Sequence, residues 1–284
     1  MCLKCRRVHS REAMEITLGR FHAQLERPEP LKFAWPIIVL PELFTTTGHL
    51  AVLIGYLATI GWEVYAPDVR AAAAQDGPRA LGRLGLSAAL AFVEEVLAAV
   101  GRDAIVVGHG AGGLLALKMA ERPHVRAAVA LAPLVPGFRT PLFMRSRNLV
   151  ALWRRRPINP PRGRTLFELI ADAEPFQREN MIKALVPDSA QLALDVARGE
   201  IELAAHPQVA PRLIVAGDSD TFAPVERVTT LARAIGAQMV TLQGRGHWII
   251  GGRALERAVA ELQRFLVRAL GQELLLLYPD EMKE

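Results

Sequence analysis

Residues 105–114 read IVVGHGAGGL, and this stretch decides the fold class. Its β-branched residues predict a buried strand, and the glycines that follow predict a tight turn. A helical pattern then runs from the turn through Glu121. We therefore expect a strand that passes through a sharp elbow into a helix, with Gly110 in the elbow.

Strand-like and helix-like segments alternate on both sides of this elbow, which is typical of a mostly parallel sheet covered by helices on both faces. Strands are expected near residues 16–26, 36–40, 62–69, 104–109, 125–133, 211–217 and 237–244, and helices near 49–61, 78–100, 111–121, 225–236 and 254–270.

The alternation stops between residues 135 and 206. This segment is helical in pattern, rich in arginine and interrupted by proline. The alternating pattern resumes after it, so the segment interrupts one fold and does not separate two. We expect a helical cap at 135–206, inserted into a core formed by residues 14–134 and 207–284.

Two loops after late predicted strands carry an acid and a base. Asp220 lies in the turn GDSDTFAP, and His247 follows the tripeptide GRG. A carboxylate that accepts a hydrogen bond from one imidazole nitrogen fixes the tautomer and raises the basicity of the other nitrogen. The pair is a candidate general base. The alternatives are a turn-forming aspartate and a structural histidine.

In type and order, these three sites resemble those of the α/β-hydrolase superfamily, over about residues 14–270. The superfamily's elbow pattern is G-x-S-x-G, so the resemblance places Gly110 where the nucleophilic serine would stand. It identifies Asp220 and His247 with the other two members of the triad. It implies an α/β-hydrolase fold with a mostly parallel sheet of about eight strands, flanking helices and a helical cap.

The segment after the second predicted strand departs from the superfamily pattern. Serine hydrolases of this type have His-Gly here, whereas this chain has Pro41-Glu42. By position, the backbone N–H groups of Leu43 and Ala111 would form the oxyanion hole. If Glu42 points inward, it places a negative charge where acyl transfer would develop another, and Gly110 offers no hydroxyl to acylate.

Three functions fit these residues. In the first, His247 and Asp220 act as a general base on a small, mainly apolar ligand, in an elimination, an isomerisation, a cofactor-free oxygenation or a direct hydrolysis by water. In the second, the chain binds a ligand or partner without catalysis; the N-Myc downstream-regulated proteins are similar in that their elbow also lacks the serine. In the third, the chain is a serine esterase or lactonase whose serine was changed to glycine by engineering.

Aromatic side chains of the predicted cap, including Phe167 and Phe176, favour an apolar ligand pocket. The arginines between residues 145 and 164 leave an acidic group on the ligand open. No dinucleotide fingerprint, P-loop or HExxH motif is present, so we expect no cofactor and no metal. The residues predicted to contact the ligand are Glu42, Phe44, His109, Phe143, Trp153 and Trp248.

The composition makes several other classes of protein improbable. The formal net charge is +5, but 29 acidic residues are interspersed among 34 basic ones, which disfavours a nucleic-acid partner. The apolar runs are shorter than the roughly 20 residues of a membrane-spanning helix. Cys2 and Cys5 are the only cysteines, and with His9 they offer too few ligands for a typical zinc site. We expect a cytoplasmic protein with a disordered leader over residues 1–13, Met14 being an alternative start.

Overall fold

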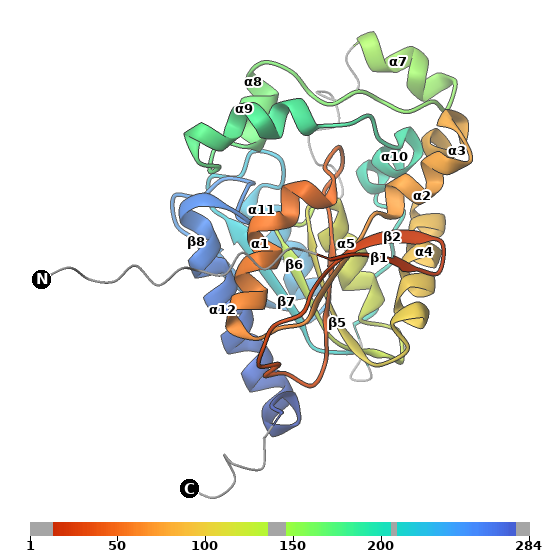
Figure 1. The fold of residues 1–284 in the computed structure, drawn as a ribbon. Coiled ribbons are helices and arrows are strands. Elements are labelled where there is room, and N and C mark those ends of the chain that lie inside the picture. Colours follow the sequence, from red (N-terminus) through yellow and green to blue (C-terminus); the bar gives the residue numbers. More distant parts are fainter. Residues whose placement is uncertain (1–13, 136–145, 206–208, 277–284) are drawn as a thin grey trace, which may run out of the picture.

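The computed structural model describes residues 14–135, 146–205 and 209–276. Within them, eight strands form one sheet in the order β1-β2-β4-β3-β5-β6-β7-β8 (Figure 1). β1 (Met14–Leu18) and β2 (Phe21–Glu26) form an antiparallel hairpin at one edge, and β2 also pairs antiparallel with β4. The parallel strands are β3 (Ile37–Leu40), β4 (Val64–Pro67), β5 (Ala104–His109), β6 (Val125–Leu131), β7 (Arg212–Gly217) and β8 (Gln238–Leu242). The mostly parallel sheet predicted from the sequence is confirmed.

The central strands are buried on both faces. Every residue of β3, β5 and β7 is buried, which explains why these segments read as continuous apolar runs. In Figure 1, α1 and α12 lie on one side of the sheet, and α4 and α5 lie on the other. The helices outside the insertion are α1 (Thr47–Ile60), α2 (Val69–Gln75), α3 (Pro78–Arg83), α4 (Leu86–Val100), α5 (Ala111–Met119), α11 (Val225–Ala234) and α12 (Gly252–Leu270), followed by the short η1 (Gly271–Leu274).

The single helix predicted over residues 78–100 is two helices, α3 and α4, with a break at Leu84 and Gly85. Two side chains from a distant segment bind the backbone at this break. Ser189 Oγ donates to the carbonyl of Leu84 at 2.7 Å, and an Asp195 carboxylate oxygen accepts the N–H of Leu86 at 2.8 Å. The prediction was wrong because these tertiary contacts replace helical hydrogen bonds that the local pattern would allow.

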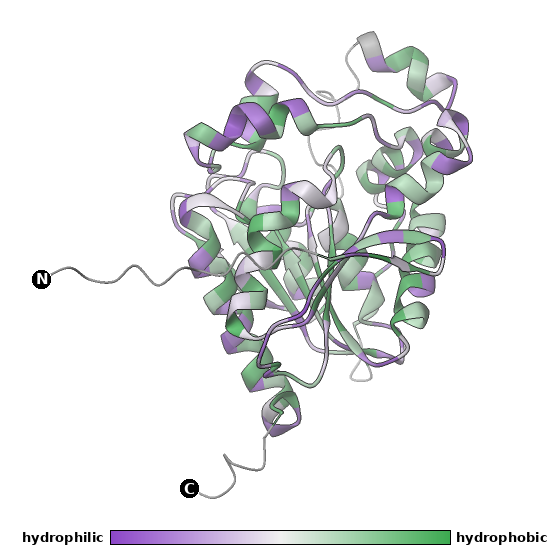
Figure 2. Cartoon of the chain, viewed as in Figure 1, coloured by the Kyte–Doolittle hydropathy of each residue, from purple (hydrophilic) through white to green (hydrophobic). Residues whose placement is uncertain are grey.

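The last helix, α12, shows how the periodicity of the sequence places the core. Leu255, Val259, Leu262 and Leu266 lie on one face and are buried, and the helix packs on β6, β7 and β8. Its remaining face is polar, which gives the alternating colours along this helix in Figure 2. No helix in the described ranges is both long and apolar enough to cross a membrane.

The described part of the predicted insertion is helical. It contains α7 (Ser146–Trp153), α8 (Arg164–Leu169), α9 (Pro175–Ala184) and α10 (Ala190–Arg198), which lie at one end of the sheet (Figure 1). α10 packs on α3 and α4, and α9 contacts α1. Backbone hydrogen bonds join Ile158 and Asp188, so the insertion is tied to itself as well as to the core. Its role as a cap stays a prediction.

Candidate functional site

Four loops meet at the carboxyl ends of the parallel strands. Glu42 follows β3, Gly110 follows β5, Asp220 follows β7 and His247 follows β8. Parallel strands end at the same edge of a sheet, so residues far apart in sequence converge there. The side chains of Glu42, Asp220 and His247 are buried together at this edge and bind one another.

The elbow after β5 has the geometry that the glycine-rich sequence requires. Gly110 has φ +53° and ψ −115°, a conformation that strains any other residue. Its N–H donates to the carbonyl of Leu131 at 3.0 Å, and its own carbonyl accepts from Leu114 and Leu134. Backbone contacts on both sides therefore fix the elbow and direct the N–H of Ala111, the first residue of α5, into the site.

Asp220 uses its two carboxylate oxygens for two different tasks. Oδ1 accepts the backbone N–H groups of Phe222 at 2.7 Å and Ala223 at 3.0 Å, which builds its own turn. Oδ2 accepts a hydrogen bond from His247 Nδ1 at 2.7 Å. Asp220 is thus both a turn-forming residue and the partner of the histidine.

The side chain of Glu42 points inward and contacts both the elbow after β5 and His247. Its Oε1 accepts the backbone N–H groups of Leu43 at 2.5 Å and Ala111 at 3.1 Å. Its Oε2 accepts a hydrogen bond from His247 Nε2 at 3.0 Å. The two N–H groups predicted as an oxyanion hole therefore hold an oxygen of the protein itself.

The carboxylate of Glu42 occupies the space where a side chain at position 110 would begin. A Cβ atom on Gly110 would overlap Oε2 and Cδ of Glu42. Gly110 and the glutamate after β3, which are two separate departures from the superfamily pattern in the sequence, are therefore neighbours in space.

The charges of this site favour a protonated histidine. Burial disfavours the imidazolium of His247, but the charges and hydrogen bonds of Asp220 and Glu42 outweigh burial and raise its pKa to about 10. Burial alone would raise the pKa of Asp220, yet its contacts with His247 and with two backbone N–H groups lower it. At neutral pH, both nitrogens of His247 donate hydrogen bonds, one to each carboxylate.

His109 and Trp248 form the apolar floor behind the triad. His109 is wholly buried, and its Nε2 lies 2.9 Å from the backbone carbonyl of His247. Burial and the nearby His247 lower the pKa of His109 to about 4, so its imidazole is neutral. The ring of Trp248 packs against it edge to face, with ring centres 5.2 Å apart. His109 thus contacts the backbone of His247, and Trp248 packs on His109.

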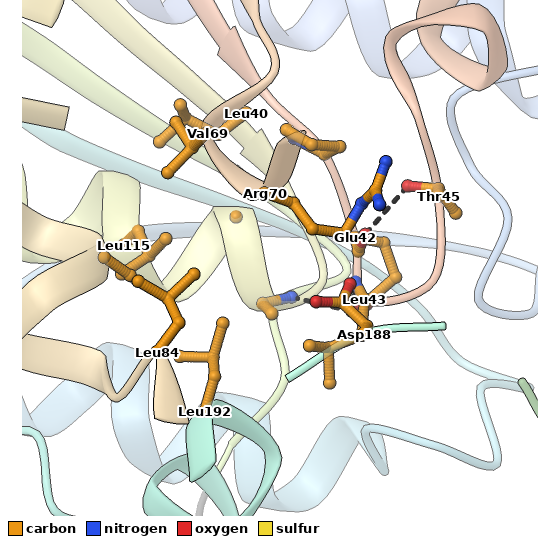
Figure 3. A pocket seen from close by; sticks show the side chains of 14 residues that line it. Leu40, Glu42, Leu43, Thr45, Val69, Arg70, Leu84, Leu115, Asp188 and Leu192 are labelled. Carbon is orange, nitrogen blue, oxygen red and sulfur yellow. Dashed lines mark hydrogen bonds between the residues drawn. The ribbon is translucent and has the colours of Figure 1, made fainter. Parts of the chain in front are cut away.

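A small cavity of about 50 Å³ lies beside Glu42 (Figure 3). Its polar lining residues are Glu42, Thr45, Arg70 and Asp188. Thr45 Oγ1 donates to the carbonyl of Glu42 at 2.8 Å and so fixes the loop after β3. The rest of the lining is mainly aliphatic: Leu40, Pro41, Leu43, Val69, Leu84, Ala89, Ala111, Gly112, Leu115 and Leu192.

Sequence reasoning missed Arg70 and Asp188. Asp188 Oδ2 accepts the N–H of Phe44 at 2.7 Å, and its Oδ1 accepts that of Ser189 at 2.6 Å. Burial raises the pKa of Asp188 to about 6. Asp188 lies just before the start of α10, where acidic residues are common, and Arg70 lies in the first turn of α2 without a motif around it, so neither position carries a signal of its own in the sequence.

The predicted ligand-contacting residues are placed unevenly. Phe44 is buried within the loop after β3, and its N–H donates to Asp188. Trp153 is 81% exposed on α7, and Phe176 is 76% exposed on α9. Neither side chain lines the cavity beside Glu42. Phe143 lies outside the described residues.

Glu42, His109 and His247 also have the spacing of metal ligands. The candidate ligand atoms, one from each residue, all lie within 4.8 Å of one another. Among the described residues, this is the one cluster of three or more such side chains with that spacing. His247 Nε2 and Glu42 Oε2 bind each other through a proton, which a cation would have to displace.

Comparisons with known proteins agree with this arrangement of strands and loops. A sequence model described as the alpha/beta hydrolase family matches residues 34–261. The chain is similar to the crystal structure of a monoacylglycerol lipase from Paleococcus ferrophilus, with 20% identity, a TM-score of 0.67 and coverage of 87% of this chain and 98% of that one. It is also similar to a soluble variant of monoglyceride lipase from Saccharomyces cerevisiae, with 15% identity, a TM-score of 0.70 and coverage of 91% and 95%. No curated protein matches the sequence significantly. The α/β-hydrolase fold expected from the sequence is confirmed.

Proposed function

The chain belongs to the alpha/beta hydrolase family, and on that premise we propose that it is an enzyme in which the carboxylate of Glu42 replaces the serine hydroxyl. Its ligand is small and mainly apolar, and Asp220 and His247 act on it together with Glu42. The observation that carries the proposal is the double contact of Glu42: Oε1 with the N–H groups of Leu43 and Ala111, and Oε2 with His247 Nε2.

The position of Oε1 selects the kind of bond that the site can attack. An ester or amide substrate needs the two N–H groups for its own developing oxyanion, and Glu42 already occupies them. A saturated carbon with a leaving group needs no oxyanion hole when it is attacked. The geometry therefore favours displacement at a saturated carbon over acyl transfer.

In the first step, a lone pair of Glu42 Oε2 forms a bond to the ligand carbon, and the leaving group departs with the bonding electrons. The product is an alkyl ester of Glu42. One of the two negative charges beside His247 is then gone, so the pKa of His247 falls and its Nε2 proton passes to the leaving group or to water.

In the second step, neutral His247 takes a proton from water, and the hydroxide adds to Cδ of the Glu42 ester. The oxyanion that forms on Oε1 is held by the N–H groups of Leu43 and Ala111. Collapse of this intermediate releases the alcohol, which carries the former Oε2, and restores the carboxylate of Glu42 and the imidazolium. The sum is the replacement of the leaving group by the hydroxyl of water.

Binding without turnover is the second candidate function. It is favoured by the small size of the cavity, about 50 Å³, and by the mutual engagement of the three side chains. The third function considered from the sequence, a serine esterase disabled at one residue, fits less well, because a serine at position 110 would overlap Glu42.

A trapping experiment separates the two candidates. 1-Bromopropane is the probe, because bromide leaves without a proton from His247. In the His247→Gln variant the ester cannot be hydrolysed, so we expect intact-protein mass spectrometry to find one propyl group, mapped by peptide sequencing to Glu42. The Glu42→Gln variant is the control and should stay unmodified. Bromide release that is equal in all variants, with no ester on Glu42, would contradict the proposal and favour binding alone.

Isotope labelling tests the same step against a direct attack by water. In a single turnover in ¹⁸O-water, propanol should contain ordinary oxygen, and the label should enter the carboxylate of Glu42. If His247 and Asp220 instead activated water directly against the ligand, the first propanol would contain the label. That result would favour the general-base reaction, the first of the three functions considered from the sequence.

A further inference from the structure

Arg70 lies on α2 and reaches over the cavity towards the loop after β3 (Figure 3). It is the one positively charged side chain among the described residues that line this cavity. Its side chain is 15% exposed, so a full charge is held in a largely buried place.

The hydrogen-bonding capacity of Arg70 is poorly used. One terminal nitrogen lies 3.4 Å from a carboxylate oxygen of Asp68, a long contact. Its Nε is buried and has no acceptor within the described part of the chain. Buried donors are almost always paired in native proteins, so an unpaired N–H at a cavity wall points to an acceptor that enters from the cavity.

The two nearest acids in the cavity do not take this place. Glu42 binds Leu43, Ala111 and His247, as described above. Asp188 binds the backbone N–H groups of Phe44 and Ser189. Among the described residues, neither acid forms an ion pair with Arg70. Burial raises the pKa of Asp188, and the charge of Arg70 acts in the opposite direction.

Building on the proposed function, we infer that Arg70 anchors an acidic group of the ligand, so that the natural ligand is a small organic acid. The guanidinium offers two parallel N–H donors to a carboxylate, which is its preferred partner. The ligand's negative charge is repelled by Glu42 and attracted by Arg70, so its uncharged carbon is turned towards Glu42 Oε2. The aliphatic wall, including Leu84, Leu115 and Leu192, accommodates the short hydrocarbon between them.

Binding of propanoate and of its neutral analogue propanamide, measured by calorimetry, tests the anchor without any chemical step. We expect the unmodified protein to bind propanoate at least about tenfold more tightly, because a charge-assisted pair is stronger than a neutral one. Arg70→Met should abolish this preference, and Arg70→Lys should keep part of it. Arg79→Met, an exposed arginine on the neighbouring α3, is the matched control and should change nothing.

Thermal unfolding of each variant shows whether it is folded, and Arg70→Lys keeps the test valid if Arg70→Met is not. Equal affinities for propanoate and propanamide in the unmodified protein would overturn the inference. So would a preference for propanoate that survives in a folded Arg70→Met variant, since another group would then bind the acid.

The alkylation experiment distinguishes this inference from the proposed function. With 3-bromopropanoate, Glu42 of the His247→Gln variant should be esterified at least about tenfold faster than with 1-bromopropane, and the added change Arg70→Met should remove the difference. Equal rates would overturn the anchor and leave Glu42 as the nucleophile. No ester with either reagent, combined with Arg70-dependent binding of propanoate, would overturn the proposed nucleophile and support the anchor as a binding site.

Discussion

The loops after β7 and β8 and the loops after β3 and β5 form the two halves of one site, and they differ in how they are held together. In the first half, Asp220 builds its own turn and then binds His247 in the adjacent loop. In the second half, a side chain cannot be added at Gly110 while Glu42 keeps its place. The first half matches the pattern of a serine hydrolase, and the second half does not.

This difference shows two ways of building a buried polar site. Asp220 is held by the backbone N–H groups of its own turn. Glu42 is held by backbone N–H groups of two loops and fills the space that the missing side chain of Gly110 leaves open. Each of the following experiments challenges one half of this comparison.

The largest effect is expected in the half formed by Gly110 and Glu42. Gly110→Ser should lower the free energy of unfolding by about 3 kcal/mol or more, because it adds backbone strain at positive φ and displaces a buried carboxylate. It should not produce esterase activity, since the displaced carboxylate of Glu42 stays near the N–H groups of Leu43 and Ala111 and repels a developing oxyanion. Denaturant unfolding and chromogenic short-chain esters measure the two outcomes.

Two further variants show whether the overlap with Glu42 is the cause. Gly244→Ser is a matched control, because Gly244 also has positive φ (+63°) but would meet nothing within 4 Å. It should cost only the backbone strain, about 1 kcal/mol. Gly110→Ser combined with Glu42→Gly should regain stability relative to Gly110→Ser alone and gain ester hydrolysis that depends on His247. If Gly110→Ser and Gly244→Ser are equally stable, the two positions in the second half are independent after all.

The next effect concerns the half formed by Asp220 and His247. Asp220→Ala should lower the free energy of unfolding by about 3–5 kcal/mol, because it leaves a buried imidazolium without its main partner and opens the turn. Asp220→Asn retains an oxygen for the N–H groups of Phe222 and Ala223, so it should cost distinctly less. Urea unfolding of both variants gives the comparison. Equal losses would mean that the turn does not support the pair, contrary to the view of this half as self-supporting.

The half formed by Asp220 and His247 was predictable from the sequence, and the half formed by Gly110 and Glu42 was only partly so. The strand PIIVL, the elbow GHGAGG and the turns that carry Asp220 and His247 are local patterns, because burial and turn chemistry leave their mark on neighbouring residues. The sequence also indicated that an inward-pointing Glu42 would place a negative charge where acyl transfer would develop another. It could not show that the carboxylate reaches His247, since that contact joins residues 205 positions apart.

The remaining errors have the same physical origin. The break between α3 and α4 depends on Ser189 and Asp195, and the cavity depends on Arg70 and Asp188. Ser189, Asp195 and Asp188 bind backbone groups of distant segments, and Arg70 lines the cavity beside residues far from it in the sequence. The prediction for the aromatic residues Trp153 and Phe176 failed differently, because an apolar side chain in a helical segment favours burial, yet both are exposed.

The smallest effect is a shift in the titration of His247, where the two halves meet. Its pKa is about 10, well above the ordinary 6.5 of an unfolded chain. The stability that this proton provides is therefore fully present below pH 6.5 and is lost as the pH rises through 10, at about 1.4 kcal/mol per pH unit within that window.

Glu42→Gln removes one of the two negative neighbours and should lower the pKa of His247 by about 1–3 units. NMR of the imidazole Cε1–H group between pH 5 and 11 measures the shift, with Glu179→Gln, a change on the exposed side of α9, as control. A His247 pKa that is the same in Glu42→Gln as in the parent would mean that Asp220 alone holds the proton. The two halves would then be electrostatically independent, and the contact between Glu42 and His247 would not help to keep His247 protonated.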